Sequence, residues 1–117
     1  MNKEVTILAT SEDVFQHMNV NELHEILADK SHVVVDIRDA TSFANGHIAS
    51  AVHLSNDTVP EFLRTADPDV PVVVCCYHGI SSQQAAQFLI SQDFTQVYSL
   101  DGGFVQWELI YPDEIER

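Results

Sequence analysis

The sequence has few basic residues. It carries five Lys and Arg against 18 Asp and Glu, so the formal net charge of its 117 residues is −13 at pH 7. Such a chain repels the phosphates of nucleic acid and the surface of an anionic membrane, so neither is expected as a partner. The excess of acidic residues favours solubility.

Cysteine is scarcer still, since only Cys75 and Cys76 are present. Two adjacent cysteines cannot build a disulfide framework, so we expect a reducing compartment, the cytoplasm. The sequence also lacks an apolar run long enough for a transmembrane helix, and it lacks the basic and apolar segments of a signal peptide. The six histidines are scattered without a CxxC or HxxxH pair, so no metal site is expected.

Two valine-rich runs, residues 31–37 (SHVVVDI) and 69–76 (DVPVVVCC), are apolar at successive positions. This pattern is typical of strands that are covered on both faces, as in a parallel sheet. Residues 95–100 (TQVYSL) form a third expected strand, and helical patterns lie between and after the strands. The alternation predicts one α/β domain, with a mostly parallel sheet flanked by helices on both faces.

Local signals mark the expected helix starts. Asn19 and Glu22 have the spacing of a capping box. Asp57 or Thr58 lies near the cap of a later helix that has Pro60 in its first turn. We therefore assign residues 1–18 to an N-terminal extension, with a short strand in VTIL (residues 5–8), and residues 19–117 to the domain.

Three more helices are predicted from the sequence. A short one in residues 39–47 ends near Gly46, and residues 104–110 (FVQWELI) form the last one. Between them, Ser81 or Ser82 caps a helix over residues 83–90. Its expected inward residues are Ala85, Ala86, Leu89 and Ile90.

The stretch CCYHGISS, residues 75–82, joins a strand end to a helix start. A cysteine there meets unpaired backbone N–H groups and the positive end of the helix, which favour a thiolate. Such surroundings lower a cysteine pKa from about 8.5 to between about 3.5 and 7.5. Gly79 allows the backbone to turn inward on the sulfur, and the same cradle suits an oxyanion or a persulfide.

The two cysteines are expected to differ. Side chains alternate along a strand, so when Cys76 ends the strand at the mouth of the loop, Cys75 points into a covered face. We predict Cys76 as the nucleophile and Cys75 as a small core residue. The competing interpretation is that both are packed, because free cysteine is among the most buried residue types.

Three ordered stretches resemble the signatures of a rhodanese domain: VVDIRDATSFANGHIASAVHL, CCYHGISS and YSLDGGFVQW. The chain is most similar to the small single-domain thiosulfate sulfurtransferases of the GlpE type. The resemblance implies that Cys76 takes a sulfane sulfur from thiosulfate as a persulfide and passes it to cyanide, a thiol or a thioredoxin-like dithiol protein. It implies no metal and no organic cofactor. The implied substrate and persulfide cradle is Tyr77, His78, Gly79, Ile80, Ser81 and Ser82.

The loop departs from that family at two positions. Ile80 stands where close relatives have a polar residue, and Gln83 stands where a basic residue often follows the loop. The loop therefore carries no fixed positive side chain, and the N–H groups of the helix start carry the anion binding.

Arg38, in the segment after the first valine-rich run, is a possible accessory residue. It can steer an anion, or it can pair with Asp36 or Asp39 to hold its own loop, and the structural ion pair is the favoured interpretation. In the same way, His47 is expected to fix its loop through a hydrogen bond rather than to act as a base.

Two other functions remain open. A cysteine phosphatase or arsenate reductase also uses a thiolate in an anion cradle, but it needs an arginine that grips the oxyanion with two hydrogen bonds. Ser82 stands six residues after Cys76, so that arginine is missing. A non-catalytic binding module of the rhodanese type is the third possibility, and the retained cysteine argues against it.

Overall fold

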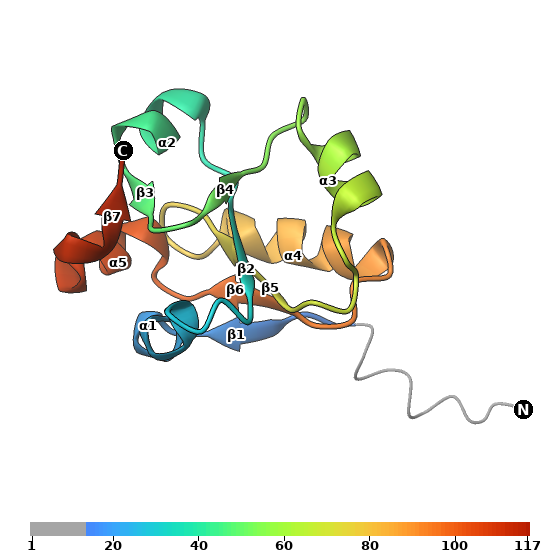
Figure 1. The fold of residues 1–117 in the computed structure, drawn as a ribbon, viewed down its shortest axis with the longest axis horizontal. Helices are drawn as coiled ribbons and strands as arrows, with labels where there is room; N and C mark the ends of the chain where they lie inside the picture. The colour runs from blue at the N-terminus through green and yellow to red at the C-terminus, as the bar shows by residue number, and fades with distance from the viewer. Residues whose placement is uncertain (1–13) are drawn as a thin grey trace, which may run out of the picture.

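A computed structural model describes residues 14–117 of the chain. Its main sheet has five strands in the order β1-β6-β5-β2-β4, and all four pairings are parallel (Figure 1). A separate antiparallel pair joins β3 to β7 near the C-terminus. The strands are β1 (Gln16–Met18), β2 (Val33–Asp36), β3 (His47–Ile48), β4 (Val52–His53), β5 (Val72–Cys75), β6 (Val97–Leu100) and β7 (Ile115–Glu116).

The two valine-rich runs form the centre of the sheet, as predicted. Successive side chains of β2 and β5 point to opposite faces, so each strand contributes to two core clusters. Val73 packs with Leu23 and Trp107 in one cluster, whereas Val74 packs with Leu89 in the other. The helices α1 and α5 therefore cover one face and α3 and α4 cover the other, which confirms the expected α/β architecture.

The helices begin and end mostly where the local signals indicated. The capping box at α1 is present, because the side chain of Asn19 accepts from Glu22 and the Glu22 side chain accepts from Asn19. Gly46 ends α2, and Thr58 precedes α3 with Pro60 in its first turn. The helices are α1 (Val20–Leu27), α2 (Ala40–Asn45), α3 (Val59–Thr65), α4 (Ser81–Ser91) and α5 (Gly103–Ile110), followed by the 3-10 turn η2 (Pro112–Glu114).

The start of α4 differs from the prediction that Ser81 or Ser82 caps it. The helix begins at Ser81, Ile80 occupies the cap position, and no side chain caps it. The N–H group of Ser82, which a capping side chain would bind, donates to the Cys76 sulfur instead, at 3.2 Å. The sulfur takes a role that a capping oxygen normally has.

The N-terminal segment contributes to the sheet. Residues 16–18, which the sequence analysis placed in the extension, form the edge strand β1 and pair with β6. The strand expected in VTIL lies outside the described residues. Within residues 14–117, no helix combines the length and the apolar character needed to cross a membrane.

Candidate active site

The Cys76 sulfur lies at the centre of the loop between β5 and α4. It accepts hydrogen bonds from the N–H groups of Gly79 and Ser82, both at 3.2 Å. Gly79 has φ +87°, and a Cβ on it would stand 2.9 Å from both Gly102 N and Leu100 O. The inward turn that aims these N–H groups at the sulfur therefore requires glycine at position 79.

These contacts favour a thiolate at Cys76. Burial raises the pKa of its thiol, but hydrogen bonds from Ser82 and from two loop N–H groups outweigh burial, so the pKa lies below its ordinary value. Cys75 behaves in the opposite way, because complete burial, aided by the charge of Asp36, raises the pKa of its thiol well above the ordinary range. The Cys75 thiol donates to the Cys76 carbonyl at 3.4 Å. The adjacent cysteines thus have opposite environments, with the acidified one facing the loop.

A buried pair of hydroxyl groups lies behind the sulfur, and the sequence analysis missed one of them. Ser82 and Ser99 are both fully buried, and their Oγ atoms are 2.7 Å apart. A thiolate only accepts hydrogen bonds, so when the Ser82 hydroxyl donates to Cys76 it must accept from Ser99. Ser99 therefore orients the hydroxyl of Ser82 toward the sulfur. A single serine in an apolar strand carries no signal in the sequence that would reveal this role.

We expect the alkylation rate of Cys76 to reach half of its maximum at a pH below about 8.5, the pKa of a free cysteine. Ser99→Ala should shift this midpoint to higher pH and slow alkylation at pH 7 about two- to tenfold, the worth of one hydrogen bond. The measurement is the rate of iodoacetamide reaction against pH, with Ser91→Ala on the exposed end of α4 as a control.

A double-variant cycle makes that test specific. If Ser99 acts through Ser82, Ser99→Ala has no further effect in a Ser82→Ala background. Equal effects of Ser99→Ala in both backgrounds would contradict the relay.

Tyr77 fastens the loop to the start of α2. Its hydroxyl donates to Asp39 Oδ2 at 2.7 Å and also contacts the hydroxyl of Ser42. Asp39 in turn accepts from the Ser42 N–H at 2.9 Å as the cap of α2. Hydrogen bonds from Tyr77 and then from Ser42 lower the pKa of Asp39 to about 2, so this carboxylate stays charged.

Arg38 forms the structural ion pair that the sequence analysis favoured. Its Nη2 lies 2.8 Å from Asp36 Oδ2 and 2.6 Å from the carbonyl of Gly46. Its guanidinium also stacks over Phe104, 3.9 Å from the ring centroid, and its side chain is only 3% exposed. The cation thus ties β2 to the end of α2 and is not presented to solvent as an anion-steering group.

The other expected site residues take different places. The backbone N–H of His78 contributes to the sulfur cradle, whereas its side chain is exposed. Ile80 is 74% exposed at the tip of the loop, and Ser81 is exposed at the start of α4. His47 bonds the Phe43 carbonyl through Nδ1 at 2.8 Å, which matches the expected loop-fixing role.

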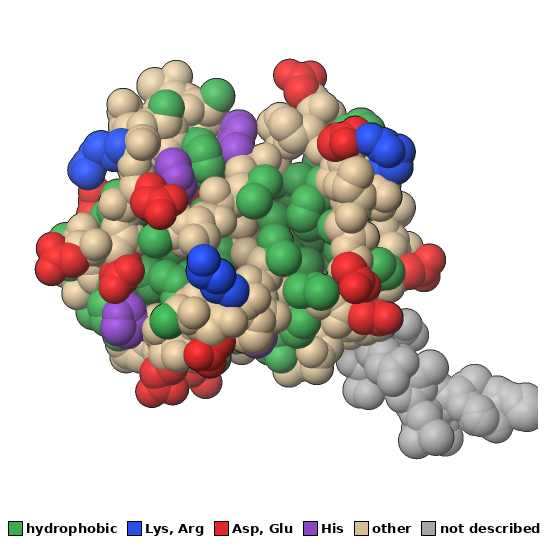
Figure 2. Space-filling view, viewed as in Figure 1, with side chains coloured by type: hydrophobic (Ala, Val, Ile, Leu, Met, Phe, Trp, Pro, Cys, Tyr) green, Lys and Arg blue, Asp and Glu red, His purple; other side chains and the backbone are tan. Residues whose placement is uncertain are grey.

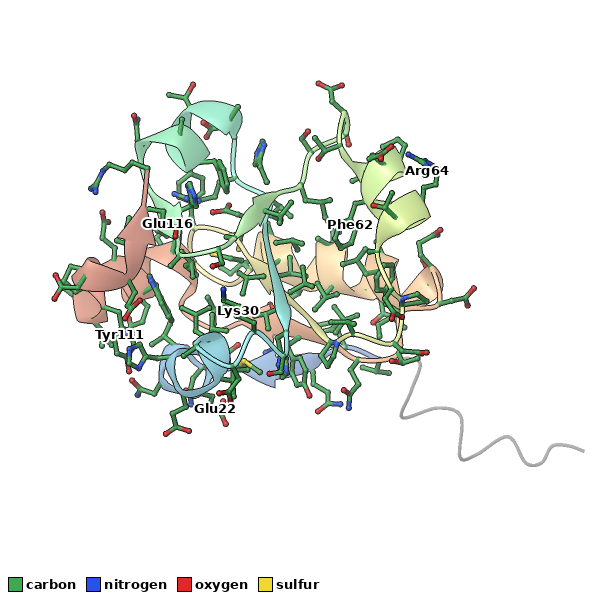
Figure 3. All side chains as sticks on the ribbon, in the orientation of Figure 1. Glu22, Lys30, Phe62, Arg64, Tyr111 and Glu116 are labelled. Carbon is green, nitrogen blue, oxygen red and sulfur yellow. The ribbon has the colours of Figure 1, made fainter. Side chains whose placement is uncertain are left out.

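Among the described basic side chains, Arg38 stands near the cradle, 5.5 Å from the Tyr77 ring centroid, but it is paired with Asp36. Arg64 pairs with Glu61 at 2.6 Å and lies on the outer side of α3 (Figure 3). Lys30 follows α1, on the face of the sheet opposite α4. Across residues 14–117, no three His, Cys, Asp or Glu side chains are grouped so as to hold a metal ion. Backbone N–H groups and two hydroxyls therefore supply the polar surroundings of the sulfur.

The chain is similar to known proteins in sequence and in fold. The family model described as a rhodanese-like domain matches residues 19–109. A rhodanese-related protein from Thermoplasma volcanium is 27% identical to this chain, with a TM-score of 0.71. The match covers 84% of this chain and 96% of that protein.

Two further solved structures share the fold at lower identity. Saccharomyces cerevisiae Ygr203w, described as a homolog of single-domain rhodanese and of the Cdc25 phosphatase catalytic domain, is 22% identical with a TM-score of 0.68. That match covers 87% of this chain and 84% of Ygr203w. Reduced Bacillus anthracis CoADR-RHD is 19% identical with a TM-score of 0.75 over 88% of this chain, which spans only 18% of that longer protein.

Proposed function

Because the chain belongs to the rhodanese-like domain family, we propose that it is a sulfurtransferase that uses a persulfide on Cys76. The proposed donor is thiosulfate, and the proposed acceptor is a thiophile such as cyanide, a small thiol or a thioredoxin-like dithiol protein. The observation that carries the proposal is the Cys76 sulfur at the focus of the N–H groups of Gly79 and Ser82.

The first half of the reaction loads the enzyme. The Cys76 thiolate attacks the outer sulfur of thiosulfate, a new S–S bond forms, and the S–S bond of thiosulfate breaks. Sulfite leaves with the electron pair of that bond, so no oxidant or proton is needed. The persulfide that remains is also an anion, and N–H donors around a helix start stabilise such anions.

The second half returns the thiolate. The acceptor attacks the outer sulfur of the persulfide, and the Cys76 thiolate leaves with the electron pair. With cyanide the product is thiocyanate, and with a thiolate it is the acceptor's own persulfide. The lowered pKa of Cys76 helps both halves, because a thiolate is the nucleophile in the first and the leaving group in the second.

A phosphatase is the second candidate, since one structural neighbour is described as a homolog of the Cdc25 phosphatase catalytic domain. The loop argues against it. Ser82 stands where a bidentate arginine is needed, and the guanidinium of Arg38 is committed to Asp36 and Gly46.

A mass spectrum of the protein after thiosulfate treatment separates these functions. Sulfur transfer predicts the gain of one sulfur atom on Cys76, and its loss when cyanide is added. Hydrolysis of an aryl phosphate without any sulfur gain would favour the phosphatase, and neither activity would favour a binding module.

Gln83→Lys should improve the use of thiosulfate. The Gln83 side chain donates to the Gly79 carbonyl at 2.9 Å, so an ammonium at this position lies next to the cradle. We expect kcat/KM for thiosulfate to rise several-fold at low ionic strength and the gain to shrink as salt is added. Gln92→Lys, at the other end of α4, makes the same change in net charge and should have little effect. Equal gains from the two variants would show that only net charge matters.

A further inference from the structure

A groove of about 750 Å³ lies beside the reactive loop. Its walls come from the segment after β2, the segment between β4 and α3, and the outer side of α4. In the view of Figure 2, hydrophobic side chains gather in a hollow next to α3. The volume lies within the range of about 300–1,000 Å³ that holds a small organic molecule.

The lining of the groove includes large apolar side chains and two carboxylates. Leu54, Val59 and Phe88 line it, and the side chain of Phe88 is 44% exposed to solvent. Asp39 and Asp57 also line it, and the low pKa of Asp39 keeps that carboxylate charged.

Lysine and arginine side chains do not neutralise these two carboxylates. Arg38 reaches the groove, but Asp36 neutralises its guanidinium. The described residues Lys30, Arg64 and Arg117 do not line the groove. The groove therefore suits a molecule with an apolar body and a positive charge.

Two residues that line the groove adjoin the reactive loop. Ser81 lines the groove, and the N–H of the next residue, Ser82, donates to the Cys76 sulfur. Asp39 also lines the groove, and it accepts a hydrogen bond from Tyr77, the residue that follows Cys76. A molecule in the groove would thus lie beside the reactive loop.

We propose that this groove binds the body of the sulfur acceptor, a small thiol with an apolar portion and an ammonium group. The proposal rests on the sulfurtransferase function. The acceptor's thiolate attacks the outer sulfur of the Cys76 persulfide, an S–S bond forms, and the Cys76 thiolate leaves with the electron pair of the bond that breaks. The net charge of −13 adds a long-range attraction for such a cation.

The test compares acceptors at a fixed thiosulfate concentration. The cationic acceptor is [4-(aminomethyl)phenyl]methanethiol, and 4-(mercaptomethyl)benzoate has the same ring with a negative charge. As alkyl thiols, both reach the enzyme with the thiol protonated at neutral pH and lose that proton to solvent before the attack. Cyanide is the reference, because it is too small to need the groove. We expect kcat/KM for the cationic thiol to fall as salt rises from about 0.01 to 0.1 M, since the Debye length shortens from about 30 to 10 Å.

Variants in the groove distinguish binding from intrinsic reactivity. Asp57→Asn and Phe88→Ser should each lower kcat/KM for the cationic thiol about three- to tenfold and leave turnover with cyanide unchanged. Asp57→Asn should have no effect with the anionic thiol or should improve its use. The matched controls are Asp113→Asn, an exposed acid in η2, and Leu109→Ser, an exposed apolar residue on α5.

The outcomes test the acceptor site and the sulfurtransferase function separately. If the groove variants behave like their controls while cyanide turnover is intact, the groove does not bind the acceptor and the sulfurtransferase function stands. If no acceptor, cyanide included, removes sulfur from the protein, both the function and the acceptor site are wrong.

Discussion

Replacing Cys76 with serine should abolish sulfur transfer and leave the fold intact. A serine hydroxyl is a far weaker nucleophile than a thiolate at neutral pH, and it cannot carry a persulfide. The smaller oxygen still accepts hydrogen bonds from Gly79 and Ser82, so the loop keeps its partners. The measurements are thiocyanate formation from thiosulfate and cyanide, and the midpoint of urea unfolding.

Cys75→Ser is the matched control. This side chain is fully buried and faces the core, away from the N–H groups of the loop. We expect sulfur transfer to persist, with a loss of stability of about 1–3 kcal/mol from the buried hydroxyl. The donor contact with the Cys76 carbonyl can be kept by serine, which places the loss toward the lower end. Loss of turnover in a folded Cys75→Ser protein, with turnover retained in Cys76→Ser, would reverse the assignment.

The second large effect is expected at Gly103, the first residue of α5. The N–H groups of Phe104 and Val105 donate to the carbonyls of Cys76 and Tyr77 at 2.8 and 3.1 Å, so the start of α5 holds the reactive loop. Gly103 has φ +60°, and a Cβ on it would stand only 2.5 Å from both of those carbonyl oxygens. These oxygens belong to the backbone and cannot move aside without moving the loop.

Gly103→Ala should therefore reduce both stability and thiolate reactivity. The left-handed backbone costs about 1–2 kcal/mol for a residue with a Cβ, and overpacking adds about 1–3 kcal/mol, so a loss of about 2–5 kcal/mol is expected. Urea unfolding measures the first effect. The pH profile of Cys76 alkylation, taken well below the unfolding midpoint, measures the second and should shift to higher pH.

Gly46→Ala is the control. Gly46 also lies near this part of the site, because its carbonyl accepts a hydrogen bond from Arg38, whose guanidinium stacks over Phe104. Gly46 has an extended φ of 162°, which any residue adopts, and an added Cβ would meet no backbone atom, only the side chains of Ile115 at 3.3 Å and Phe104 at 3.8 Å. We expect a loss of less than about 1 kcal/mol and an unchanged alkylation profile. A similar loss in the two variants would show that the close approach at Gly103 does not control the loop.

The loop and the groove together suggest how one small domain separates donor from acceptor. The cradle is made of N–H groups that donate to the Cys76 sulfur, and we expect it to bind anionic sulfur species at short range. The groove is lined by Asp39 and Asp57, and it favours a cation with an apolar body. Thiosulfate and the acceptor would then be selected by different surfaces that share one sulfur atom.

Much of the fold follows from local patterns in the sequence. The valine runs 33–36 and 72–75 predict central strands because both faces of a parallel sheet must be apolar. The pair Asn19 and Glu22 predicts the start of α1, because a capping box satisfies backbone groups within four residues. The loop after the second run also indicates a sulfur nucleophile, because a strand end, a glycine and a helix start are adjacent in the chain.

The tertiary structure decided what surrounds that sulfur. The start of α4 was wrongly predicted, because the partner of the Ser82 N–H is a sulfur placed by the fold rather than a neighbouring side chain. Tyr77 meets Asp39 across 38 positions, and Ser99 meets Ser82 across 17, only because β2 and β6 both lie beside β5. Sequence spacing records which groups a helix or strand brings together, whereas contacts between separate loops and strands depend on strand order, which only the folded chain defines.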